Sequence, residues 1–295
     1  MSAPVFVDAL DLHAQLDSGD APIVLDATLL LHRPRFDGDF RAESGRDRWR
    51  EAHLPGSRHV AIDTEFSVPH ATHDHHEQPQ GIADRLAALG VGEGTRVVVY
   101  DSVGTIWAAR LWYLLDWIGV PVSVLDGGLA AWRSAGLPIE SGDDATPPGA
   151  SQPAREWVAR TVRDAWVERD EIALARSGAL VCGLPASAFT GAEPTRYARR
   201  GHIPGSVNVP ARTLFDRDGR ILPADEVLSR YQEAGADLDG ELLLYCGGGI
   251  SATANALALA HAGFRRVRVY DGSLEEWSAD PALPLNTEEA FAGTR

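Results

Sequence analysis

The sequence predicts an α/β protein of two tandem domains, each with a central parallel sheet covered by helices. Three observations predict this fold: an internal repeat, a polar segment between the two copies, and short apolar runs separated by helical patterns. The length of 295 residues suits two domains of ordinary size, each large enough to bury its own core.

The internal repeat is the most informative observation, because a repeat sets the architecture of the whole chain. Three segments recur in the same order and at nearly constant spacing. They are AHLPGSRHVAID (52–63) and GHIPGSVNVPAR (201–212), RVVVYDSVGTIW (96–107) and ELLLYCGGGISA (241–252), and SVLDGGLAAW (123–132) and RVYDGSLEEW (268–277). We therefore predict a tandem duplication of one α/β domain.

The segment between the copies, SGDDATPPGASQPAR at 141–155, is rich in Gly, Pro, Ser and Asp. Such a composition cannot bury much apolar area and is typical of an exposed linker. We therefore place a first domain at 1–142, a linker at 143–155 and a second domain at 156–295.

Short runs of Val, Ile and Leu without alternation indicate parallel strands that are buried on both faces. These runs are PIVLDA (22–27), VVVY (97–100), ALVCG (179–183) and LLLYC (242–246). Helical patterns separate them, for example at 81–90 and 225–235. Trp132 and Trp277 occupy equivalent positions in the two copies, so we expect both to pack helices against the sheets.

Composition and charge exclude several classes of function. Asp and Glu exceed Lys and Arg by 42 to 27, and the resulting net charge of −15 repels nucleic acids and anionic lipid surfaces. No apolar run is long enough to span a membrane. The first residues do not resemble a secretion signal, and two cysteines cannot form a disulfide framework, so we expect a cytoplasmic protein.

Cys246 is the strongest candidate for a catalytic residue. It ends an apolar run and precedes a segment of helical composition, and the residues after it are Gly247, Gly248, Gly249, Ile250 and Ser251. Glycines of this kind can aim successive N–H groups at one point, and a helix N-terminus adds partial positive charge. We therefore expect a nucleophilic thiolate whose pKa is lowered from about 8.5 toward about 3.5–7.5. The alternative is a buried structural cysteine.

These motifs together resemble the two-domain sulfurtransferases of the rhodanese and 3-mercaptopyruvate sulfurtransferase superfamily. The matching segments are HLPGS (53–57), HIPGS (202–206), the six-residue loop from Cys246 to Ser251, and YDGSLEEW (270–277). The resemblance implies that the second domain carries the active cysteine and that the first is catalytically silent. Asp101 stands in the first copy where Cys246 stands in the second.

The resemblance implies that Cys246 takes sulfur from a donor as a persulfide and passes it to a thiol, cyanide or a thioredoxin-like acceptor. The loop Cys-Gly-Gly-Gly-Ile-Ser carries no cation and is similar to that of the mercaptopyruvate enzymes, so 3-mercaptopyruvate is the expected donor. Thiosulfate is the alternative donor, and a non-catalytic persulfide carrier is a third hypothesis. A phosphatase needs an Arg to close the loop, where this chain has Ala252. No cofactor or metal is expected.

The resemblance also implies a proton relay of serine, histidine and aspartate. Gly248 stands where the serine is expected, whereas Asp63 and His75 align with the other two members. His75 lies in HATHDHHEQP (70–79), and the alternatives for this segment are a solvated loop or adventitious metal binding.

Two donor-binding arginines of the family are replaced here by Leu184 and Ala188. Arg196 aligns with a further arginine that binds the donor carboxylate, and Arg199 and Arg200 are nearby substitutes. We therefore predict Arg196 as the donor-binding residue. The alternative is that all three are surface arginines.

Cys182 stands in place of a family aspartate, at the end of the run ALVCG (179–183). The carboxyl ends of parallel strands gather at one edge of a sheet, so we expect Cys182 near Cys246 and consider it a possible redox partner. The alternative is a small buried apolar residue.

Overall fold

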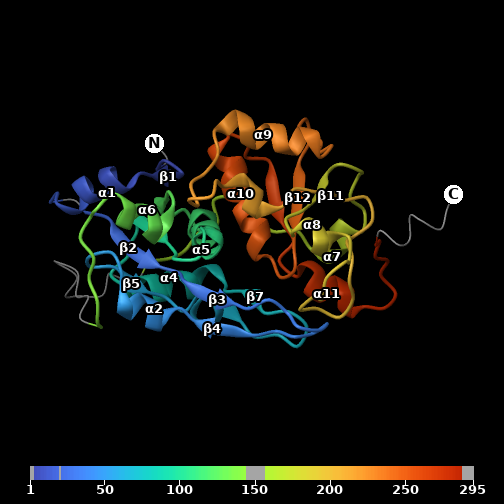
Figure 1. Ribbon diagram of the computed structural model, residues 1–295, viewed down its shortest axis with the longest axis horizontal. Coiled ribbons are helices and arrows are strands. Elements are labelled where there is room, and N and C mark those ends of the chain that lie inside the picture. Colours follow the sequence, from blue (N-terminus) through green and yellow to red (C-terminus); the bar gives the residue numbers. More distant parts are fainter. Residues whose placement is uncertain (1–2, 20, 144–156, 288–295) are drawn as a thin grey trace.

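The computed structural model describes residues 3–19, 21–143 and 157–287, which form two α/β halves side by side (Figure 1). The linker predicted at 143–155 lies outside the described residues except for Asp143. Within the described part of the chain, no helix combines the length and the apolar character that spanning a membrane requires.

The first half contains a five-stranded sheet in which every pair of neighbours is parallel. Across the sheet the strands are β1 (Phe6–Val7), β9 (Val122–Leu125), β8 (Val97–Tyr100), β2 (Ile23–Asp26) and β5 (Arg58–His59). The apolar runs predicted at 22–27 and 97–100 are its central strands. The prediction of a parallel sheet is therefore confirmed for this half.

The second half repeats the arrangement. Its parallel sheet consists of β11 (Val207–Asn208), β10 (Leu180–Cys182), β12 (Leu242–Tyr245) and β13 (Val267–Val269). A parallel bridge between Trp166 and Val269 lies where β1 lies in the first half. The two sheets thus have the same strand order, which is the structural form of the sequence repeat.

Helices cover both faces of each sheet. In the first half they are α1 (Ala9–Leu16), α2 (Arg46–Glu51), α3 (Ile62–Glu65), α4 (Pro79–Ala88), α5 (Ile106–Trp117) and α6 (Gly128–Ser134). In the second half they are α7 (Arg169–Ile172), α8 (Ala186–Phe189), the 3-10 helix η1 (Ala211–Leu214), α9 (Ala224–Glu233), α10 (Ile250–His261) and α11 (Ser273–Ala279). The helical patterns predicted at 81–90 and 225–235 correspond to α4 and α9.

The two halves share one hydrophobic core. Strand alternation sends Val97 and Val99, and likewise Leu242 and Leu244, into this shared core, together with the buried residues of α5 and α10. The opposite faces of the sheets carry two smaller cores, one containing Trp132 and the other Trp277. Both tryptophans therefore pack a helix against a sheet, as predicted.

Helices α5 and α10 occupy equivalent positions in the two copies and pack against each other between the sheets (Figure 1). Both are apolar around most of their circumference, as expected for helices without a solvent-facing side. Among the residues of α5, only Asp116 is not buried. The contact between these two helices is therefore largely apolar.

Two hairpins extend the first half toward the second. One pairs β3 (Leu29–Leu31) with β4 (Ala42–Ser44), and the other pairs β6 (Ser67–Val68) with β7 (His75–His76). In Figure 1, β3 and β4 run below the molecule toward α11. The turn after β3 reaches the second half through a hydrogen bond from Gly38 N to Thr195 O at 2.8 Å.

A strand-end tyrosine holds each His-x-Pro-Gly-Ser turn. Tyr245 Oη accepts a hydrogen bond from Ile203 N at 3.1 Å and lies 2.7 Å from Ser206 Oγ. Tyr100 Oη makes the equivalent contacts, with Leu54 N at 3.3 Å and Ser57 Oγ at 2.9 Å. The repeated turn is thus tied to the strand that leads into the loop at Cys246 or Asp101.

We expect Tyr245→Phe to lower the free energy of unfolding by about 1–3 kcal/mol, because it leaves the buried Ile203 amide without its acceptor. Denaturant unfolding followed by tryptophan fluorescence measures the change. Leu174→Ala is the control, because Leu174 is 84% exposed and its truncation leaves stability unchanged. Equal stability of Tyr245→Phe and the wild type would show that the hydroxyl does not support the turn.

Candidate active site

A cavity of about 750 Å³ lies between the halves and is lined by residues of both. Its walls combine apolar side chains with charged and other polar ones. The first half contributes Leu29, Phe40, Asp63, His73, Trp107 and Arg110, and the second contributes Leu184, Arg196, Tyr197, Cys246, Gly248 and Glu275. Cys246 therefore opens into a chamber that neither half forms alone.

Cys246 directly follows β12 and begins the loop that leads into α10. Hydrogen bonds to the side chain of Ser273 hold this loop in place. Ser273 Oγ accepts hydrogen bonds from Cys246 N and Gly249 N, both at 3.0 Å. Gly249 has φ of +76°, a conformation that glycine adopts without strain. This backbone turns the N–H groups of Gly248, Ser251 and Ala252 toward the sulfur.

The sequence predicts a lowered pKa for Cys246, whereas the structure gives a raised one. Burial raises the pKa of the thiol, and the nearby Glu275 carboxylate raises it further. The amides of Ala252, Gly248 and Ser251 act in the opposite direction and do not outweigh burial. Sequence reasoning counted the amide cradle and missed both the desolvation of a side chain that is 2% exposed and the facing carboxylate.

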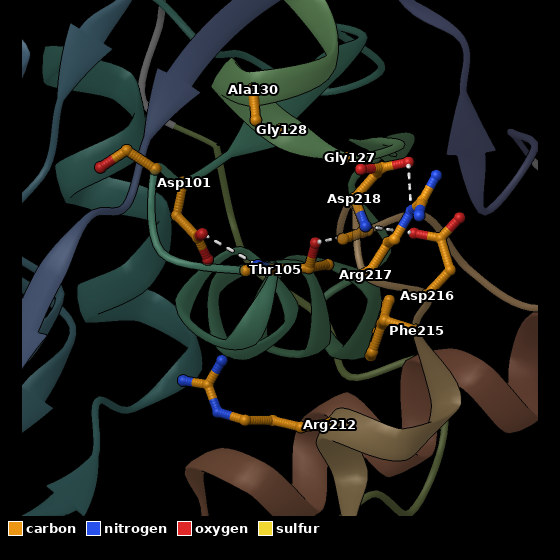
Figure 2. Close-up of a pocket in the computed structure, with 13 residues that line it drawn as sticks. Asp101, Thr105, Gly127, Gly128, Ala130, Arg212, Phe215, Asp216, Arg217 and Asp218 are labelled. Atoms are coloured by element: carbon orange, nitrogen blue, oxygen red, sulfur yellow. Dashed lines mark hydrogen bonds and ion pairs between the residues drawn. The ribbon is translucent and has the colours of Figure 1, made fainter.

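The equivalent loop of the first half surrounds the carboxyl group of Asp101, whose pKa is raised by burial and lowered by hydrogen bonds from backbone amides, with burial the larger effect (Figure 2). Asp101 Oδ1 accepts from Val103 N at 2.8 Å and Thr105 N at 2.9 Å, and Oδ2 accepts from Trp107 N and Ala108 N at 2.9 Å. Four amides thus converge on one carboxylate. The first copy of the cradle thus donates hydrogen bonds to both carboxyl oxygens of Asp101, and amides arranged in this way favour an anion in the equivalent cradle at Cys246.

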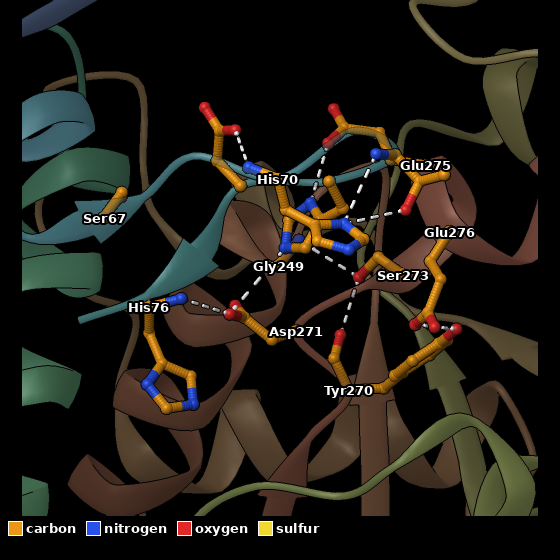
Figure 3. A network of polar contacts seen from close by, with 12 residues as sticks. Ser67, His70, His76, Gly249, Tyr270, Asp271, Ser273, Glu275 and Glu276 are labelled. Carbon is orange, nitrogen blue, oxygen red and sulfur yellow. Dashed lines mark hydrogen bonds and ion pairs between the residues drawn. The ribbon is translucent and has the colours of Figure 1, made fainter. Parts of the chain in front are cut away.

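A buried cluster of charged residues joins the halves beside the cysteine loop. Arg110 Nη1 on α5 donates to Asp271 Oδ1 at 2.6 Å. His73 Nδ1 lies 2.8 Å from Glu275 Oε2, and His73 Nε2 lies 3.7 Å from Asp271 Oδ2. His76 N also donates to Asp271, at 2.8 Å (Figure 3). The first half thus places cations against carboxylates of the second.

These contacts shift the titration of His73 and Asp271. Burial disfavours the charged imidazolium, but the Asp271 carboxylate at 3.7 Å and the hydrogen-bonded Glu275 carboxylate outweigh it and raise the pKa of His73 to about 9. Burial likewise opposes ionisation of Asp271, yet Arg110 and His73 hold its pKa far below the ordinary range. His73 is therefore a cation at neutral pH.

The structure favours His73 over His75 for the histidine beside the cysteine loop. His75 is exposed on β7 and is not among the residues that line the cavity, whereas His73 is buried and lines it. Asp63 lies on α3, exposed at the cavity wall. Four histidines in ten residues indicated a histidine here, but only the fold of the hairpin decides which one points inward.

Arg196 lines the cavity, as its predicted role requires. Its Nη2 donates to the backbone oxygen of His32, while its buried Nε has no hydrogen-bond partner within the described residues. Burial lowers the pKa of the guanidinium. An unpaired buried N–H on a cation favours an anionic ligand at this position.

Other residues near Arg196 do not bind the donor in this arrangement. Arg199 donates to backbone oxygens of Ser278 and Asp280, and Arg200 pairs with Asp37 at 2.8 Å. Both arginines are structural and are not substitutes for the missing donor-binding residues. Ala188 is buried in α8 outside the cavity lining, whereas the lining includes Leu184.

Cys182 is buried and faces away from Cys246. The register pairs it with Tyr245, one residue before Cys246, so alternation sends the two cysteine side chains to opposite faces of the sheet. Burial raises the pKa of Cys182 to about 12. The predicted strand adjacency is present, but a disulfide would need the backbone to rearrange, so the geometry favours a structural role.

The fold and the site together define a two-domain α/β protein with a cysteine in the loop before the N-terminus of a helix. The Rhodanese-like domain family matches residues 9–135 and 192–280, one match in each half. The chain therefore belongs to the rhodanese-like family, and its curated relatives place it among the sulfurtransferases.

A Pseudomonas aeruginosa protein named "Probable 3-mercaptopyruvate sulfurtransferase" is 33% identical, over 97% of this chain and 99% of that protein. The thiosulfate sulfurtransferase of Gallus gallus is 32% identical, over 79% of this chain and 80% of its own. The solved structure of 3-mercaptopyruvate sulfurtransferase from Leishmania major superposes with a TM-score of 0.75 at 26% identity, covering 94% of this chain and 74% of that one.

We expect His73→Gln to lower stability most below pH 6.5 and progressively less as the pH rises toward 9. A histidine whose pKa is raised from 6.5 to about 9 stabilises the fold while it is protonated, and that contribution is lost as the pH passes the raised value. Unfolding measured at a series of pH values gives the difference from the wild type. His75→Gln is the matched control and leaves the profile unchanged. A pH-independent difference for His73→Gln would exclude the protonated pair.

Proposed function

We propose that this sulfurtransferase takes sulfur from 3-mercaptopyruvate as a persulfide on Cys246 and passes it to a thiol, cyanide or a thioredoxin-like acceptor. One observation carries the proposal: Cys246 lies in an amide cradle that opens into the same cavity as Arg196, whose buried Nε has no hydrogen-bond partner in the part of the chain that the structure describes. The cradle suits the persulfide anion, and the guanidinium suits a carboxylate.

In the first step the sulfur of Cys246 attacks the sulfur of the donor, and the donor's carbon–sulfur bond breaks. The cysteine thiol and mercaptopyruvate become a cysteine persulfide and pyruvate, so atoms and protons balance without an added oxidant. In the second step a thiol or cyanide removes the outer sulfur and returns the cysteine. Covalent catalysis thereby divides one transfer into two easier ones.

Thiosulfate is the alternative donor, and the relative from Gallus gallus is named for it. The charges around the loop favour mercaptopyruvate, because Glu275 faces the cradle and a dianion would meet a like charge there. A non-catalytic persulfide carrier would form the same persulfide but would not turn over small donors. Turnover kinetics with both donors therefore distinguish the three hypotheses.

We expect Cys246→Ser to remove transfer from both donors, because a serine hydroxyl does not ionise near neutral pH. The wild type, mixed with donor and no acceptor, should gain about 32 Da, the mass of one sulfur atom, in the intact-mass spectrum. Cys182→Ser is the matched control and should retain the gain and the turnover. Turnover by a folded Cys246→Ser protein above about 5% of wild type would refute the assignment.

We expect Arg196→Met to raise the KM for 3-mercaptopyruvate by about ten- to a hundredfold, because a charge-assisted hydrogen bond contributes about 1.5–3 kcal/mol. Steady-state kinetics measure the change. Arg200→Met is the control, since Arg200 pairs with Asp37 outside the cavity lining. An unchanged KM in the folded Arg196→Met variant would place the donor carboxylate elsewhere.

A further inference from the structure

Gly248 lacks a side chain, and the carboxylate of Glu275 fills the space that one would occupy. A Cβ added to Gly248 would lie 2.8 Å from Glu275 Oε2 and 2.9 Å from Oε1. Glu275 N also donates to Gly247 O at 2.8 Å, which fixes the start of α11 against the loop. The backbone therefore holds this carboxylate over the cysteine loop.

The silent copy lacks this arrangement. Leu129 N bonds Asp101 O as Leu274 N bonds Cys246 O, so Ala130 is the counterpart of Glu275. Val103 is the counterpart of Gly248, because the amide of each donates to the side chain two residues earlier, Asp101 or Cys246. The first copy thus has Val103 in the loop, which is larger than Gly248, and Ala130 on the facing helix, which is smaller than Glu275. The carboxylate is present only beside the cysteine.

Glu275 is also the outer member of the charged cluster that reaches the cavity. Its Oε2 lies 2.8 Å from Nδ1 of His73, and the other ring nitrogen of His73 lies 3.7 Å from Asp271 Oδ2. The Glu275 side chain is 23% exposed and lines the cavity together with Cys246 and Arg196. Figure 3 shows Glu275 and Asp271 among the members of this network.

We propose that Glu275 is the proton-transfer residue of this enzyme: its carboxylate takes the proton of the Cys246 thiol and delivers it to the donor carbon that loses sulfur. This inference rests on the function proposed above and deepens it, since it assigns the proton step to a residue outside the loop.

The chemistry of the donor requires such a group. The buried Cys246 thiol must lose its proton to attack, and the departing pyruvate leaves as an enolate that must gain one at its methylene carbon. Glu275 becomes a carboxylic acid when it accepts the first proton and returns to a carboxylate when it gives the proton to carbon. His73 holds the carboxylate in place through its 2.8 Å contact, so it is a positioning residue.

Thiosulfate requires the same deprotonation of the Cys246 thiol but no protonation of carbon. Its leaving group is sulfite, which departs with the electron pair of the sulfur–sulfur bond and needs no proton on carbon. The Glu275 charge also opposes the approach of a dianion. The two donors therefore respond differently to the loss of this carboxylate, which a merely structural role would not produce.

The test compares Glu275→Gln with wild type on both donors. We expect kcat with 3-mercaptopyruvate to fall by about 100-fold or more and kcat with thiosulfate to fall at least about tenfold less, because thiosulfate loses only the deprotonation of the thiol and not the protonation of carbon. Glu276→Gln is the matched control, because Glu276 is the next residue on α11, bonds Tyr270 Oη at 2.7 Å and is not among the cavity-lining residues. It should change neither donor by more than about twofold.

Gly248→Ala supplies an independent variant. Its added methyl displaces the Glu275 carboxylate, so mercaptopyruvate turnover should fall, and the double variant with Glu275→Gln should lose little more than either alone. An equal fall for both donors in Glu275→Gln, or no fall with mercaptopyruvate, would overturn the role of Glu275. A wild-type protein that uses thiosulfate but not mercaptopyruvate would instead overturn the proposed donor, and the wild-type assay alone reveals that failure.

Discussion

Helices α5 and α10 pack against each other in a core that both sheets share, and the composition of the cavity depends on this packing. Each helix is apolar on nearly all sides and would be poorly solvated alone. Their contact fixes the halves so that side chains of the first half reach the loop of the second. Without it Arg110 and His73 would not face Asp271 and Glu275.

Burying the charged cluster at this interface costs desolvation free energy, and the pairing of each charge with a partner offsets that cost. Buried charges are tolerated when each finds a partner, and here Asp271 is met by Arg110, by the His76 amide and by His73. This pairing specifies one relative orientation of the halves, which apolar packing between two similar helices does not fix to the same degree. The same groups leave one carboxylate, Glu275, exposed to the cavity.

Comparison of the two copies separates scaffold from chemistry. Both retain the strand order, the tyrosine-bound turn and the amide cradle at the start of the central helix. They differ in the group held by the cradle, where Asp101 fills it in one copy and Cys246 in the other. The first copy therefore contributes part of the cavity wall, and the second carries the cysteine that we propose as the nucleophile.

The sequence by itself determined the duplication, the parallel sheets and the candidate nucleophile, because repeats, apolar runs and a Cys-Gly-Gly-Gly loop are local patterns. It predicted Arg196 as the donor-binding residue, and Arg196 lines the cavity; it also chose His75, which is outside the lining, where the fold turns His73 inward. The tertiary structure decided the pKa of Cys246, because burial and the Glu275 carboxylate, which lies on another element, outweigh the local amides. It also decided the pairing of Arg110 with Asp271, which lie far apart in the chain. Electrostatic interactions of this kind depend on distance and burial, and no periodic pattern in a sequence records them.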